Sequence, residues 1–267
     1  MHFLALLLAV CLLFSPAKVL PQPANTLRFC VEESEFPPFN YRQRNISSPA
    51  PLVGYDIDIL RRVFVPAQIT YDVVGLPWRR CLKEVQQGLI DGAMSASLNP
   101  QRKQDFLPSV PYYFLHPSFY YLKADYPQGL SAKQAEQLST LGPVCGISGF
   151  NYDNFGFNNL QTIYRIKDVY LLPKMLAQKR CAFFLARSEI FTATVAIRQL
   201  HHLTNDLAEQ RLEQVEPESF HLLVSPLSPE KDQILSLFNK KIMELEASGQ
   251  LNQLLEYHLY LLTQFEP

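Results

Sequence analysis

LIDGAMSASLNPQRKQDFLPSVPYY, residues 89–113, joins an apolar run, two serines, an arginine and a tail rich in proline and tyrosine. The apolar run at 89–94 predicts a buried strand. Ser95, Ser97 and Arg102 follow it in a turn. Side chains that follow a strand lie at the carboxyl end of a sheet, where open α/β sheets bind ligands. We therefore expect Arg102 to face a cleft, although a solvated loop arginine is the alternative.

The flanking sequence alternates short β-branched or aromatic runs with amphipathic stretches, which indicates an α/β protein. Strand–helix pairs are predicted at 26–31 with 54–64, and at 69–74 with 76–88. Parallel strands need such helical crossovers, so a parallel sheet follows. Residues 110–123 are extended, aromatic and broken by prolines, which predicts a crossing into a second lobe.

The same alternation resumes in the second lobe and then returns to the first. We predict two lobes, each a mixed, mostly parallel sheet flanked by helices, joined by two hinge crossings. Lobe 1 is expected at residues 25–113 with 220–267, and lobe 2 at residues 114–219. The later predicted elements are strands at 142–147, 162–166, 180–186 and 220–225 and helices at 172–179, 187–200, from 228 and after 249.

Composition excludes one class of partner. The 267 residues include 24 Lys and Arg against 25 Asp and Glu, without a dense basic run, so nucleic acid is not an expected partner. With 48% apolar residues, the chain can bury one large or two modest cores.

An apolar run at residues 3–14, followed by the small residues Ser15 and Ala17, predicts a signal peptide. We expect it to span residues 1–17, with cleavage as late as residue 24 as an alternative, and the mature protein to be periplasmic. Cys11 leaves a lipoprotein anchor open as a second interpretation.

Four cysteines remain after the predicted signal peptide: Cys30, Cys81, Cys145 and Cys181. An even number in an exported protein indicates two disulfides, for which three pairings are possible, and four buried thiols are the alternative. Their spacing matches no zinc pattern, and we expect neither metal nor cofactor.

Four motifs keep the order found in one known family. They are FPPFNY (36–41), GYDIDIL (54–60), GLIDGAMSASLNPQR (88–102) and SGQLNQLLEYH (248–258). Together they resemble the extracytoplasmic solute-binding proteins of the amino-acid-transport type, which have the bilobal type II periplasmic binding fold. The resemblance implies a monomer that closes on a small anionic or zwitterionic ligand and presents it to an inner-membrane transporter or a sensor.

The resemblance also implies roles for lobe 1 residues. Arg102 matches the arginine that binds a ligand carboxylate through both prongs, assisted by Ser97 and Ser95, and a guanidinium fork suits a carboxylate. Phe36 and Trp78 match an aromatic clamp around the ligand, although Trp78 alone could simply begin the apolar face of a helix.

In lobe 2 the resemblance is weaker. Ser148 and Asn151 lie in a glycine-rich loop that matches a ligand-binding turn, for which an ordinary glycine turn is the alternative. Family members that bind amino acids usually end the next strand with an aspartate for the α-ammonium, and the matching position is assigned to Ala186, followed by Arg187. If Arg187 faces the cleft, the ligand carries two anionic groups or is not an amino acid; Glu189 is the possible substitute for the aspartate.

This layout favours Cys30–Cys81 and Cys145–Cys181 as the disulfides, because bridges within each lobe leave the hinge free. The same fold also hosts cyclohexadienyl dehydratases, so an enzyme is the rival hypothesis, and a purely signalling member is a third. A lyase needs an acid or base in the cleft. The candidates are Glu33, Glu35, Glu189 and His116.

Overall fold

The computed structural model describes residues 26–264 except 131, 133–134 and 158–159, so the predicted signal peptide lies outside the described residues. We use lobe 1 for the sheet that contains β1 and its helices. Its α-helices and strands are β1 (Leu27–Glu32), β2 (Tyr41–Arg42), β3 (Leu52–Val53), α1 (Tyr55–Phe64), β4 (Tyr71–Leu76), α2 (Trp78–Gln86), β5 (Gly92–Ser97), α3 (Pro100–Asp105), β6 (Leu107–Pro108), β7 (Tyr113–Leu115), β13 (Glu218–Val224), α7 (Lys231–Ala247) and α8 (Gln250–Thr263).

Lobe 2 is built on a separate sheet. Its elements are β8 (Pro117–Leu122), α4 (Ala135–Ser139), β9 (Val144–Ile147), β10 (Ile163–Ile166), α5 (Leu172–Ala177), β11 (Phe183–Arg187), α6 (Ser188–Ile197) and β12 (Leu207–Arg211).

Both sheets are mixed. The lobe 1 order is β4-β1-β5-β13-β6, with β7 also paired to β13, and the lobe 2 order is β10-β9-β11-β8-β12. The strands β1, β4 and β5 run parallel, as do β9, β10 and β11, whereas β8 and β13 pair antiparallel with their neighbours. The antiparallel strands are those that enter or leave a lobe through the hinge.

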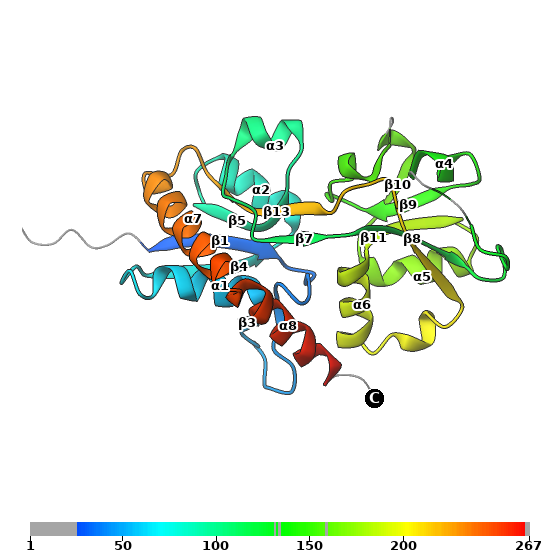
Figure 1. Cartoon of the computed structure of the whole chain (residues 1–267), viewed down its shortest axis with the longest axis horizontal. Helices are drawn as coiled ribbons and strands as arrows, with labels where there is room; N and C mark the ends of the chain where they lie inside the picture. Colours follow the sequence, from blue (N-terminus) through cyan, green and yellow to red (C-terminus); the bar gives the residue numbers. More distant parts are fainter. Residues whose placement is uncertain (1–25, 131, 133–134, 158–159, 265–267) are drawn as a thin grey trace, which may run out of the picture.

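Two strands lie side by side across the middle of the molecule and connect the lobes (Figure 1). β7 pairs with β13 through Leu115 opposite Glu218 and Tyr113 opposite Phe220. The chain enters lobe 2 after β7 and returns to lobe 1 at β13. The lobe boundaries at 113/114 and 219/220 stay a prediction.

The start of α1 illustrates why this sequence folds as it does. Gly54 precedes the helix at φ 124°, and a Cβ there would lie 2.4 Å from the carbonyl oxygen of Phe39, so only glycine fits. Asp56 and Asp58 occupy the first turn, where carboxylates interact well with the helix dipole. The buried Ile59 lies on the face turned toward the core.

The third predicted strand is displaced by three residues. The backbone N–H groups of Leu89 and Ile90 still bond to the carbonyl of Glu84 in α2, so this part of the apolar run closes the helix. The strand therefore begins at Gly92 and includes Ser97. The two serines lie in β5 itself and not in a turn.

The structure differs from the sequence-based expectations at two further places. The edge strand β12 was not expected, because its alternating charged residues hide the strand pattern. The helix expected from residue 228 begins at Lys231, because the hydroxyl of Ser228 donates to Asp91 and accepts from the backbone of Glu230.

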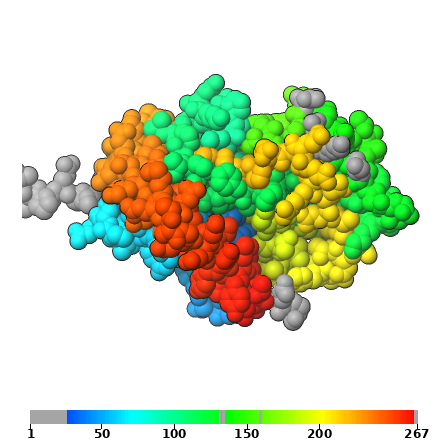
Figure 2. All heavy atoms as spheres, in the orientation of Figure 1, coloured from blue at the N-terminus to red at the C-terminus, as the bar shows by residue number. Residues whose placement is uncertain are grey.

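The lobes also touch away from the hinge. Leu262 of α8 packs in one cluster with Ala193 and Ile197 of α6, and Figure 2 shows the C-terminal helix lying against lobe 2. Arg198, at the end of α6, donates to the carbonyl of Ser34 at 2.8 Å and contacts the carboxylate of Glu35 at 3.3 Å. The structure is therefore closed.

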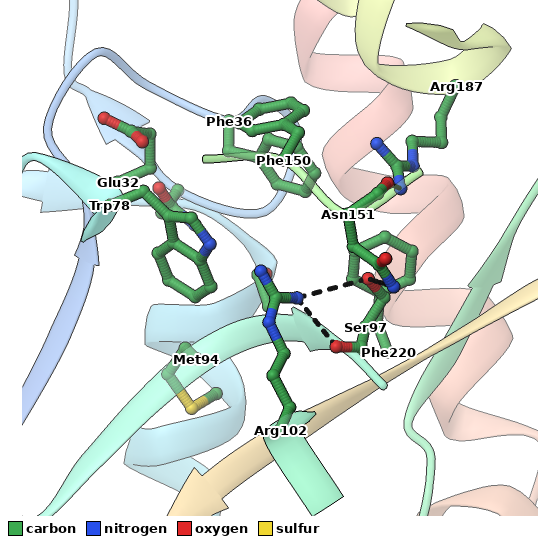
Figure 3. A pocket seen from close by; sticks show the side chains of 12 residues that line it. Glu32, Phe36, Trp78, Met94, Ser97, Arg102, Phe150, Asn151, Arg187 and Phe220 are labelled. Carbon is green, nitrogen blue, oxygen red and sulfur yellow. Dashed lines mark hydrogen bonds between the residues drawn. The ribbon is translucent and has the colours of Figure 1, made fainter. Parts of the chain in front are cut away.

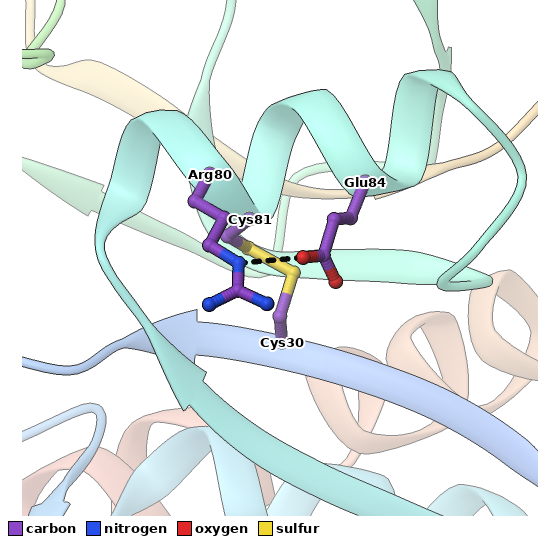
Figure 4. Close-up of a disulfide and its surroundings, with 4 residues drawn as sticks. All are labelled: Cys30, Arg80, Cys81 and Glu84. Carbon is purple, nitrogen blue, oxygen red and sulfur yellow. Dashed lines mark hydrogen bonds and ion pairs between the residues drawn. A yellow bond between two sulfur atoms is a disulfide. The ribbon is translucent and has the colours of Figure 1, made fainter.

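Both expected disulfides are present, each within one lobe. Cys30 on β1 is bonded to Cys81 on α2, with their Cα atoms 5.8 Å apart (Figure 4). Cys145 on β9 is bonded to Cys181 before β11. Among the described residues, no helix is long and apolar enough to span a bilayer, and no group of side chains forms a metal site.

Candidate functional site

A small cavity of about 30 Å³, which we name the inner cavity, lies between the lobes. It has room for about one or two water molecules. Of the eight predicted ligand-binding residues, all except Ser148 line it (Figure 3). They are Phe36, Trp78, Ser95, Ser97, Arg102, Asn151 and Arg187.

Arg102 lies in the short helix α3, just after β5. The side chain of Asn99 caps this helix by accepting from the backbone N–H of Arg102 at 2.8 Å. This bond fixes the start of the helix and thereby the position of the Arg102 backbone. Arg102 Nη1 donates to the carbonyl of Ser97 at 2.7 Å, and its guanidinium lies 5.7 Å from the centre of the Trp78 ring (Figure 3). The side chain is thus held against the cavity wall.

The charge of Arg102 has no carboxylate partner among the described ion pairs, although the residue is only 8% exposed. Its hydrogen-bond acceptors among the described residues are neutral: the carbonyl and hydroxyl of Ser97 and the carbonyl of Gly149. Burial, and next the nearby charge of Arg187, lower the pKa of Arg102 to about 10. The site therefore holds a desolvated cation that an anion would stabilise.

Ser95 has a structural partner. Its hydroxyl donates to Asp56 at 2.6 Å, and Asp56 also accepts from Tyr112 at 2.6 Å and Asn40 at 2.7 Å. Burial raises the pKa of Asp56, because these donors do not fully offset its loss of water. Because its hydrogen is engaged, the Ser95 hydroxyl can only accept a hydrogen bond from a ligand.

A loop of lobe 2 reaches directly into the lobe 1 site. The side-chain amide of Asn151 donates to Ser97 Oγ at 3.2 Å and to the carbonyl of Leu98 at 3.1 Å, while Arg102 donates to the carbonyl of Gly149 at 3.4 Å. These bonds join the groups that the sequence predicts to hold a carboxylate.

Phe150, which sequence reasoning did not assign to the site, fills the space between the lobes. Its ring lies 5.7 Å from that of Phe36 in an edge-to-face arrangement, and 5.7 Å from the Arg187 guanidinium. It packs against the cores of both lobes. The sequence signal that could have identified Phe150 was its position next to the predicted site residue Asn151.

Ala186, the position matched to the family's aspartate, does not line the inner cavity. Successive residues of a strand point to opposite faces, and Ala186 packs in the lobe 2 core with Phe184, whereas Arg187 lines the cavity. Arg187 faces the inner cavity, but its charge is paired within the protein. Its Nε donates to Glu218 Oε2 at 2.7 Å, and both side chains are almost fully buried.

A second, larger space of about 390 Å³, the outer cavity, adjoins the first. Ser148 and the candidate acid Glu33 lie there, so neither reaches the inner cavity. Glu32, which sequence reasoning missed, lines both cavities together with Trp78.

The remaining candidate acids and bases line neither cavity. Glu35 is paired with Arg44 at 2.7 Å, and His116 Nδ1 lies 2.6 Å from Glu189 near the hinge. Glu189 therefore does not replace the aspartate expected at the ligand.

Comparisons with known proteins agree with this architecture. AbpA of Streptococcus pneumoniae, an amino acid ABC transporter substrate-binding protein solved with L-arginine, has a TM-score of 0.69 and 18% identity, over 89% of this chain and 96% of that chain. A second S. pneumoniae substrate-binding protein, solved with histidine, has a TM-score of 0.66 and 15% identity, over 86% and 90% of the two chains.

ArtJ of Geobacillus stearothermophilus, an arginine-, lysine- and histidine-binding protein, has a TM-score of 0.65 and 16% identity, over 86% of this chain and 93% of that chain. These likenesses confirm the predicted two-lobed type II fold. A search of curated protein sequences found no match. The profile of the bacterial extracellular solute-binding proteins, family 3, matches residues 27–260, and the chain belongs to that family.

Proposed function

We propose that this protein captures a small carboxylate-bearing ligand, an amino acid or a related organic acid, in the inner cavity. The observation that carries the proposal is Arg102, a buried cation whose hydrogen-bond acceptors among the described residues are all neutral. A carboxylate can accept from both prongs of the guanidinium, and each such charge-assisted bond contributes about 1.5–3 kcal/mol. The aromatic walls of Trp78 and Phe36 would pack against the rest of the ligand.

Ligand entry requires the lobes to separate, because the inner cavity of about 30 Å³ is much smaller than an amino acid. Phe150 and Asn151 would withdraw with lobe 2, which frees Arg102 and Ser97 from their bonds across the cleft. Bending at β7 and β13 is the motion that the two crossings permit. A ligand favours the closed form only by the difference between its affinities for the two forms.

The biological setting follows from the family. We propose a periplasmic monomer, exported by the signal peptide at 1–17, that delivers its ligand to an inner-membrane transporter. A sensor is the alternative partner. In this first proposal the residues bind the ligand and do not catalyse a reaction.

One observation keeps a lyase as the second candidate. Burial raises the pKa of Glu32, which lines the inner cavity, and a general acid needs such a shift. Turnover of prephenate or arogenate by the purified protein would establish this second function.

The test is a thermal-shift screen of amino acids, dicarboxylates and small aromatic acids, beginning with arginine and histidine because related structures hold them. A ligand at about 100 times its dissociation constant adds about 2.7 kcal/mol, or roughly 5–11 °C in melting temperature. Arg102→Ala should abolish the shift and change the unliganded melting temperature little, because it removes the cost of burying a cation together with that cation's hydrogen bonds to neutral acceptors.

Arg80→Ala is the matched control, because Arg80 is exposed on α2 and pairs only with Glu84. It should leave the ligand shift unchanged. Arg102→Lys should weaken binding at least tenfold, because an ammonium cannot make the two-pronged contact. Full binding by Arg102→Ala would contradict the proposed site.

A further inference from the structure

Glu32 ends β1 and lines both the inner and the outer cavity. Figure 3 shows its carboxylate beside Trp78. The residue is partly buried, so a ligand in either cavity can reach it without crossing the core.

The carboxylate of Glu32 has neutral hydrogen-bond donors. Its Oε1 accepts from the backbone N–H and the hydroxyl of Ser34, each at 2.9 Å, and the backbone N–H of Trp78 also faces it. Because these donors are uncharged, they orient the carboxylate but do not neutralise its negative charge. Arg79, Arg165 and Lys167 line the outer cavity, but among the described residues no cation forms an ion pair with Glu32.

The ionisable side chains that line the inner cavity are of two kinds: one is paired with an opposite charge inside the protein, and the others are not. Arg187 is neutralised by Glu218, which lies behind it and is fully buried. Arg102 and Glu32 have no such partner among the described ion pairs. The inner cavity therefore offers one positive and one negative group, with the ring of Trp78 in contact with the first and its backbone facing the second.

We propose that Glu32 binds the cationic group of a zwitterionic ligand whose carboxylate is bound by Arg102. This inference rests on the proposed function and names the ligand class for the same site. Both charged contacts then come from lobe 1, since Glu32 ends β1 and Arg102 lies in α3.

This arrangement has a mechanistic consequence. The position at the end of β11, where an ammonium partner was sought, holds Arg187, and a cation cannot bind a second cation. With both ends of the ligand held by lobe 1, the open form binds the zwitterion through its charges. Closure then adds neutral contacts from Phe150 and Asn151 of lobe 2.

The experiment compares each of the twenty amino acids with its des-amino carboxylic acid by calorimetry on the wild-type protein. We expect at least one zwitterion to bind at least tenfold more tightly than its des-amino partner. If no zwitterion shows this preference, the proposal is overturned without any variant having to fold.

Glu32→Gln then tests the residue, using the zwitterion and des-amino acid of the preferred pair. The zwitterion should bind at least tenfold more weakly, while the des-amino acid should stay within about twofold of wild type. Glu32→Asp, which keeps the charge, should recover part of the affinity. Glu33→Gln is the matched control, since Glu33 is exposed and lines only the outer cavity, and it should change neither ligand.

Two results separate this proposal from the broader one. If Glu32→Gln binds the zwitterion as wild type does while Arg102→Ala does not bind it, the carboxylate site stands and the role of Glu32 is refuted. If Arg102→Ala also binds normally, the proposed function itself fails.

Discussion

Replacing Glu218 with alanine isolates the charge of Arg187 inside the protein. The two side chains are 0% and 2% exposed and meet at 2.7 Å between Nε and Oε2. Glu218 also accepts from the amide of Asn154 at 2.9 Å. The variant therefore leaves a buried guanidinium without its counter-charge and removes the shorter hydrogen bond of the partly buried Asn154 amide.

The expected cost is large. Removing one partner of a buried ion pair destabilises a protein by about 3–5 kcal/mol, because the other charge stays desolvated. For a chain of this length each 1 kcal/mol lowers the melting temperature by about 2–4 °C, so the loss is roughly 6–20 °C. Total stabilities are about 5–15 kcal/mol, and the variant is expected to fold only marginally.

The double variant Arg187→Met with Glu218→Leu should recover most of this loss. The rings of Phe150, Tyr152, Phe155 and Phe220 lie 4.9–5.7 Å from the guanidinium, so the surroundings suit an apolar side chain. Replacing a whole buried pair by apolar groups is often neutral or stabilising.

Urea unfolding under non-reducing conditions measures these differences. Asp125→Ala is the matched control: its pair with Lys179 is exposed, and its loss should cost less than about 1 kcal/mol. The reasoning is refuted if Glu218→Ala costs no more than this control, or if the double variant is less stable than Glu218→Ala.

Two other predictions concern stability and lobe closure. The double variant Cys145→Ser with Cys181→Ser removes a disulfide whose cysteines are 36 positions apart, and it should lower the free energy of unfolding in urea by about 4 kcal/mol. The ligand affinity should stay within about twofold of wild type, because the bridge lies within lobe 2. A loss of stability below about 1 kcal/mol would contradict this prediction. Acid should loosen the lobes at Glu35: burial acts to raise its pKa, but hydrogen bonds from Arg44 and Arg42 in lobe 1, and to the smallest extent the charge of Arg198 in lobe 2, outweigh burial and lower it. The contact therefore stabilises closure above the ordinary pKa of glutamate and is lost as the pH falls through the lowered value. The radius of gyration from X-ray scattering should rise in that range, and Glu35→Gln should remove the pH dependence; an unchanged pH profile in the variant would argue against it.

Local patterns explain why much of the fold was predictable. Strand and helix positions follow from side-chain periodicity, which is a property of neighbouring residues. The same local reasoning placed Arg102 beside a cleft, because a residue just after a parallel strand lies at the sheet edge where clefts form. The strand carrying Ser97 was displaced by three residues, since element ends depend on hydrogen bonds that periodicity does not reveal.

The sequence could not predict which face of a strand a side chain lies on, or which charged side chains form ion pairs. Ala186 and Arg187 are adjacent, and a shift of one residue moves a side chain to the opposite face of a strand. The partner of Arg187 is Glu218, 31 positions away on the returning hinge strand. Glu32 was passed over because nothing in its local sequence distinguishes it from Glu33.

The sequence by itself determined the order of strands and helices, the even set of cysteines and the motifs shared with the family. The tertiary structure alone decided which charges remain for a ligand. Arg187 and Arg102 are both buried arginines that line the inner cavity, but among the described ion pairs only Arg187 meets a carboxylate. Neutralisation of a buried charge depends on distance in space, and folding brings those groups together from distant parts of the chain.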